Sequence, residues 1–109
     1  MSVYEVEGGW RYISPVEERA FRIDISSYPN ELASIGSTTL FDTTSYDNIS
    51  QVGGSPLTGT STHSDGVITT QKVDGSALTH GNQYSLEVVW TDTAGNEWLI
   101  VVPLICRRR

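Results

Sequence analysis

Two adjoining segments near the end of the chain differ in how apolar and polar residues are arranged. In residues 84–91 large apolar side chains alternate with mostly polar ones, which is typical of a strand with one buried face. In residues 98–106 every position is apolar. Residues 92–96 contain Gly95, which suits the left-handed position of a short hairpin loop. The pattern predicts a β-hairpin whose second strand, residues 97–107, is apolar on both faces.

Shorter strands are predicted upstream of this hairpin. In residues 18–26, Phe21, Ile23 and Ile25 alternate with polar or small residues, which again indicates a half-buried strand. After a turn at residues 28–31, residues 31–35 have room for one helical turn at most. Further strands are expected at 38–46 and 67–73, with short edge strands around 49–52 and 57–60 in the polar region 47–62.

About seven short strands separated by turns predict an all-β fold, a single β-sandwich. A chain of 109 residues has room for one hydrophobic core. We divide it into an N-terminal arm or first edge strand, residues 1–16, and a sandwich with a short basic tail, residues 17–109. The arm carries several aromatic side chains, among them Trp10 and Tyr12, so it is either the domain's first strand or a contact with a neighbouring molecule.

The residues before the hairpin form a recognisable pattern, Leu78-x-x-Gly81-x-x-Tyr84. A leucine that caps the core, a glycine that lets the backbone turn, and a tyrosine whose hydroxyl bonds to upstream backbone together make the tyrosine corner of immunoglobulin-like sandwiches. We therefore expect Leu78, Gly81 and Tyr84 to form the structural corner at the start of the strand. The alternative is that Tyr84 is an ordinary core tyrosine.

The order of segments from Glu18 to Arg107 resembles the small immunoglobulin-like proteins of tailed-phage structural gene clusters. The resemblance is carried by the strand FRIDISSY, a middle rich in Ser, Thr and Gly, the corner, and TDTAGN before the last strand. It implies one immunoglobulin-like sandwich behind a short arm, and a place in the capsid, the head–tail region or the tail. It supplies no catalytic motif and no functional residues that could be transferred to this chain.

The charge of the chain and its lack of targeting segments limit the classes of partner that we expect. The net charge is −6, which argues against nucleic acid as a partner because general binding needs a basic patch. The N-terminus has neither the basic nor the apolar region of a signal peptide, and no apolar run is long enough to cross a bilayer. A lone cysteine, Cys106, has no partner for an intramolecular disulfide. We expect synthesis in the host cytoplasm and no membrane partner.

No combination of residues predicts catalysis. The histidines, His63 and His80, fall in predicted loops without a neighbouring nucleophile motif. The aspartates adjoin turns and do not match the spacing of a calcium loop. Cys106 follows the alternation of the core face, where it serves as a small apolar residue. We therefore expect a protein that is not an enzyme, with no catalytic residues, metal or cofactor.

The strand that is apolar on both faces raises the question of what covers its second face, because an exposed apolar row favours aggregation. The chain's own arm and another subunit are both candidates. Trp90 is expected in the core, whereas Trp10 and Trp98 fit a core, a protein contact or a sugar platform. The candidate partner interface comprises Trp10, Tyr12, Leu99, Val101, Ile105, Arg107, Arg108 and Arg109.

These observations favour a non-catalytic structural or accessory protein of a phage virion, most concretely a capsid decoration protein. Its partners would be capsid or tail proteins, with the chain present as a homo-oligomer or in many copies on the particle. A head–tail or tail accessory is a close alternative. A carbohydrate- or receptor-binding module that uses Trp10, Trp98 and the polar loop at 47–64 is the alternative from a different class.

Overall fold

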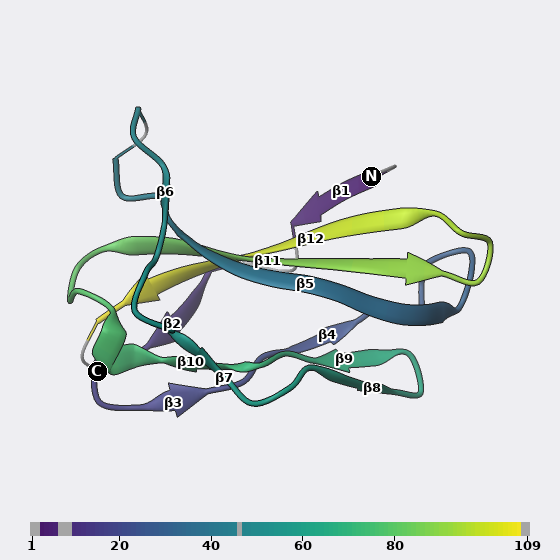
Figure 1. Cartoon of the computed structure of the whole chain (residues 1–109), viewed down its shortest axis with the longest axis horizontal. Coiled ribbons are helices and arrows are strands. Elements are labelled where there is room, and N and C mark those ends of the chain that lie inside the picture. Colours follow the sequence, from purple (N-terminus) through teal and green to yellow (C-terminus); the bar gives the residue numbers. More distant parts are fainter. Residues whose placement is uncertain (1–2, 7–9, 46, 108–109) are drawn as a thin grey trace.

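The computed structural model is a two-layer β-sandwich (Figure 1). It describes residues 3–6, 10–45 and 47–107, and for residues 3–6 the backbone alone. The larger sheet has the strand order β1-β12-β11-β5-β6, and β2 joins it beside β12. The bounds are β1 Val3–Val6, β2 Arg11–Ile13, β5 Leu32–Asp42, β6 Ser50–Gln51, β11 Gln83–Asp92 and β12 Glu97–Cys106.

The second layer consists of two three-stranded segments, β3-β10-β7 and β4-β9-β8, which lie end to end below the larger sheet in Figure 1. Two hydroxyls span the break between the segments. The backbone N–H of Phe21 donates to Thr70 Oγ1 at 3.0 Å, and that of Gln71 donates to Ser61 Oγ at 3.1 Å. The bounds are β3 Glu18–Arg19, β4 Arg22–Asp24, β7 Leu57–Thr58, β8 Thr62–Ser64, β9 Val67–Thr69 and β10 Lys72–Asp74.

The strand order agrees with an immunoglobulin-like sandwich. Strands β5, β11 and β12 correspond to the C, F and G strands of one sheet, and the B, E and D strands of the other correspond to β3/β4, β9/β10 and β7/β8. The predicted all-β sandwich is therefore confirmed. In the described part of the chain, no helix is long and apolar enough to cross a membrane.

Four segments differ from the local expectations. Residues 31–35 form no helical turn, because β5 begins at Leu32 and pairs there with Asp92 of β11. The strand expected at 38–46 therefore starts earlier and ends at Asp42. The strands expected at 18–26 and 67–73 are each interrupted, because the hydroxyl of Thr70 replaces a backbone partner at the break.

The core lies between the two sheets and takes one face of each long strand. Every second residue of β12 points into the core, on the same side of the sheet as the apolar face of β11. Ile13 of β2 is also fully buried, so the core extends into the segment 1–16. The members of the core cluster that come from the larger sheet are Ile13, Leu40, Tyr84, Leu86, Val88, Trp90, Ile100, Val102, Leu104 and Cys106.

The corner predicted from the sequence is formed at the start of β11. The backbone N–H of Thr79 donates to the Tyr84 hydroxyl at 2.9 Å, and Leu78 is buried in the core. Gly81 has a φ of +90°, a conformation that favours glycine, and its N–H donates to the carbonyl oxygen of Cys106 at 2.6 Å. The corner therefore ties the start of β11 to the end of β12.

Replacement of Tyr84 with Phe removes the hydroxyl that satisfies the Thr79 N–H. We expect the free energy of unfolding to fall by about 1 kcal/mol or somewhat more. The measurement is urea denaturation at neutral pH, with Tyr12→Phe as the control because Tyr12 is exposed. Equal stability of the Tyr84 variant and the wild type would contradict a stabilising corner.

Candidate interaction surfaces

The outer face of the larger sheet carries an apolar band. Its members alternate along β5, β11 and β12 with the core residues, so they point away from the core. Most are half-buried, and Val101 is 8% exposed. We call this set the outer band: Phe41, Val89, Leu99, Val101, Pro103 and Ile105.

Glu87 lies in the middle of the outer band. The strand register places it between Val101 of β12 and Thr39 of β5. Burial raises the pKa of the Glu87 carboxyl, and no side chain among the described residues forms a hydrogen bond or ion pair with it. The position of Glu87 could not be predicted from the sequence, because a glutamate on the polar face of an alternating strand is ordinary until its neighbours across the sheet are known.

The edge of β12 is occupied by the chain's own N-terminal segment. β1 pairs in parallel with residues 98–101, and β2 pairs in parallel with residues 104–106. This pairing places the backbone of the arm in the same sheet as its own strand β12. The side chains of residues 1–9 lie outside the described residues, as does the structure of Arg108 and Arg109.

One end of β12 gathers four of the predicted interface residues, Trp10, Tyr12, Ile105 and Arg107. Tyr12 pairs with Ile105, and the guanidinium of Arg107 lies 4.6 Å from the centre of the Tyr12 ring. Trp10, just before β2, is 47% exposed and Tyr12 is 38% exposed. Leu99 lies farther along β12, roughly 20 Å from Ile105 at the rise of a strand. The predicted residues therefore fall into two groups along one strand.

Trp98 is part of an aromatic cluster at the other end. Its ring stacks on Trp90 with centroids 5.8 Å apart, and the ring of Tyr28 meets both tryptophans edge-on. Trp98 Nε1 also donates to Asp92 Oδ2 at 3.0 Å. Since the β2 pairing places Trp10 near the opposite end of β12, the two tryptophans do not form a common sugar platform.

Asp92 holds the hairpin turn together. Its Oδ1 accepts from the backbone N–H groups of Ala94 and Asn96, each at 2.9 Å. Its Oδ2 accepts from the side chains of Trp98, Asn30 and Asn96. Burial alone would raise the pKa of Asp92, but these hydrogen bonds outweigh burial and lower the pKa to about 2. An aspartate at the start of a hairpin loop was a usable sequence indication of this role.

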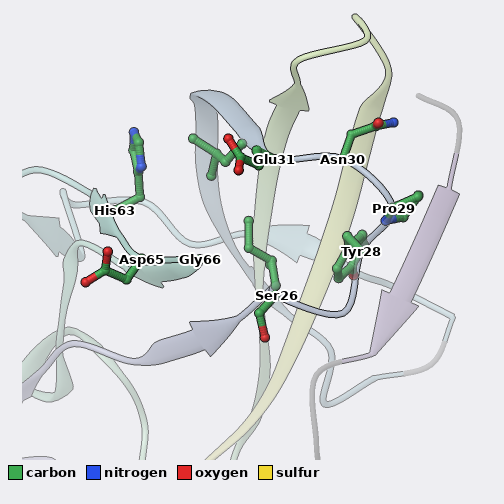
Figure 2. Close-up of a pocket in the computed structure, with 10 residues that line it drawn as sticks. Ser26, Tyr28, Pro29, Asn30, Glu31, His63, Asp65 and Gly66 are labelled. Atoms are coloured by element: carbon green, nitrogen blue, oxygen red, sulfur yellow. The ribbon is translucent and has the colours of Figure 1, made fainter.

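A cleft of about 510 Å³ opens at the end of the sandwich that carries the β8–β9 turn. Figure 2 shows His63 and Asp65 on one wall and Tyr28, Asn30 and Glu31 on the other. The second wall is fixed, since Asn30 donates to Asp92 and the N–H of Thr93 donates to the Glu31 carbonyl oxygen at 2.9 Å. The cleft was not predicted, because its walls come from segments far apart in the sequence.

The ionisable groups of the described residues are dispersed. His63 lines the cleft, whereas His80 lies in the corner loop at the other end. No three His, Cys, Asp or Glu side chains of the described residues lie close enough together to hold a metal ion. Cys106 is fully buried, and burial raises the pKa of its thiol, which disfavours the reactive thiolate.

The chain matches no protein-family model, and no curated protein matches it. The geometry and chemistry of its surfaces therefore provide the grounds for a function. Two surfaces stand out, the outer band with Glu87 at its centre and the cleft between residues 25–32 and 63–66.

Replacement of Asp92 with Asn should lower stability at neutral pH, because an amide nitrogen cannot accept the hydrogen bonds that Oδ2 accepts. We expect the midpoint of thermal unfolding to fall by at least about 5 °C at pH 7. The ionised carboxylate stabilises the fold fully above its ordinary pKa of 3.8, and this contribution is lost as the pH falls through about 2.

The difference between the variant and the wild type should therefore shrink as the pH falls from about 4 to about 2. Thermal unfolding across this range is the measurement, and Asp65→Asn, in the exposed β8–β9 turn, is the control. A difference that stays constant with pH would contradict the role of the ionised Asp92.

Proposed function

We propose that this protein is a non-catalytic structural protein of a tailed-phage particle, most concretely a decoration protein that binds the capsid exterior. The outer band carries the proposal. The other face of β12 already fills the core with Ile100, Val102 and Leu104, so the apolar residues of the band are not needed to close the sandwich. A band of this kind favours association with another protein surface.

The way in which the two ends of the β11–β12 hairpin are held supports attachment of the protein through the face of its larger sheet. The corner and the Asp92 turn hold β11 and β12 at opposite ends of the hairpin, so the outer band is presented on a rigid pair of strands. A rigid face loses little conformational freedom on binding, which favours affinity. The order of segments resembles that of small phage sandwich proteins. This resemblance supports the shell of a particle as the surface to which the outer band binds.

A head–tail or tail accessory would use the same face and differ in the number of copies per particle. A carbohydrate- or receptor-binding module is the second candidate, and the cleft favours it. A volume of about 510 Å³ lies within the range of small-molecule sites, roughly 300–1,000 Å³. Such a ligand would meet Tyr28 and the polar side chains of Glu31, His63 and Asp65.

Replacement of Leu99 with Lys tests the proposed attachment. A lysine at this half-buried position keeps its stem on the sheet and places a charge in the outer band. We expect incorporation into particles to fall by at least about tenfold, measured by comparing the bound fraction of each variant on purified particles. Val101 is less suitable, because at 8% exposure a charged replacement would also disturb the fold.

The matched control is Val16→Lys, since Val16 is 79% exposed and lies outside the outer band. It should bind particles as the wild type does. Normal incorporation of the Leu99 variant would contradict attachment through the outer band. Binding of glycans by the free protein, lost on replacement of Tyr28 but not of Leu99, would instead favour the module with the cleft.

A further inference from the structure

The outer band contains one ionisable side chain at its centre. Glu87 is flanked on its own strand by Ser85 and Val89, and across the sheet by Thr39 and Val101. None of these neighbours is charged. The groups that face Glu87 from β5 and β12 are hydroxyl or apolar side chains: Thr39, Phe41, Leu99, Val101 and Pro103.

Any protein that covers the outer band removes Glu87 from water. A charged carboxylate in an apolar contact is strongly unfavourable unless a cation or hydrogen-bond donors replace its water. Partial burial in the single chain already raises the pKa of Glu87, and a covering surface would increase this effect. The outer band therefore discriminates between covering surfaces by the charge that they bring to its centre.

A second copy of the chain is the wrong partner for this face. When two copies cover each other's outer band about a two-fold axis through the middle of the patch, the centre of one band meets the centre of the other. This contact would bring two Glu87 carboxylates close together in an apolar setting. The net charge of −6 on each copy adds to the repulsion. Copies of this chain can therefore lie near one another on a particle without pairing through the outer band.

The face is large enough for a specific contact. Figure 1 shows the larger sheet above the second layer. At the rise of a strand, β5, β11 and β12 are each roughly 35 Å long, and at a strand spacing of about 4.8 Å the path β1-β12-β11-β5-β6 is up to about 24 Å wide. A specific interface commonly buries about 800 Å² on each partner. The face can supply this area with Glu87 near its middle.

We infer that the outer band binds a partner protein that presents a lysine or arginine against Glu87 within an apolar surface, and that Glu87 prevents two copies of this chain from pairing through the same face. This inference deepens the proposed function and rests on the docking role of the outer band. A basic side chain would replace the water lost by Glu87 with a charge-assisted hydrogen bond.

The test uses a variant of this chain as the partner, with a lysine at the centre of its outer band. The variant Glu87→Lys presents the same apolar band with a lysine at its centre. Mixed with the wild type at neutral pH, it should form a one-to-one complex, while each protein alone stays monomeric in sedimentation velocity. We expect the mixed pair to be at least about tenfold tighter than self-association of either protein, and to weaken as salt is added.

Glu18→Lys is the matched control, because Glu18 is exposed on the opposite sheet and the change in charge is the same. It should not pair with the wild type. Absence of the mixed complex, or self-association of the wild type as tight as the mixed pair, would overturn the inference. A complex formed equally well with Glu18→Lys would show general charge attraction and would overturn it too.

A second variant covers the case in which Glu87→Lys does not fold. Glu87→Gln keeps the shape and removes the charge, so it should self-associate at least about tenfold more tightly than the wild type. A monomeric, folded Glu87→Gln protein would overturn the role of Glu87 in preventing self-pairing. These measurements need no phage particle, so absence of the protein from particles would refute the particle proposal and leave this inference standing.

Discussion

Strand β12 is constrained on three sides, and the rest of the molecule is arranged around it. One edge pairs with β11 and the other with β1 and β2, so its backbone hydrogen bonds are used along most of its length. Its inner face fills the core between the sheets. On its outer face, Leu99, Pro103 and Ile105 are partly exposed, whereas Val101 is buried. The partly exposed apolar side chains are available for contacts with another molecule.

Two local devices hold the β11–β12 pair at its ends. At one end, Asp92 accepts hydrogen bonds from the turn and from Trp98, and so fixes the turn, the aromatic cluster and one wall of the cleft together. At the other end, Tyr84 and Gly81 tie the entry of β11 to the last residue of β12. Polar groups that are satisfied inside the fold in this way specify a single arrangement of the strands. The outer band is thereby presented on a firm surface.

The parts that could be predicted from the sequence are those with a local cause. The hairpin follows from a period of two and from Gly95, whose φ is +87°, and the corner follows from a short motif. The start of β5 was missed because its pairing with Asp92 lies far away in the sequence. The break at Thr70 depends on a hydroxyl that replaces a backbone partner. The apolar surroundings of Glu87 could not be predicted, because its neighbours lie on two other strands, β5 and β12.

The central claim is that this chain is a structural component of a particle, bound through one face of its larger sheet. Quantitative mass spectrometry of purified particles, scaled to the major shell protein, tests it most directly. Decoration of the capsid predicts that the chain is present at an abundance comparable to that of the shell protein. Absence of the chain from the particles would contradict the account.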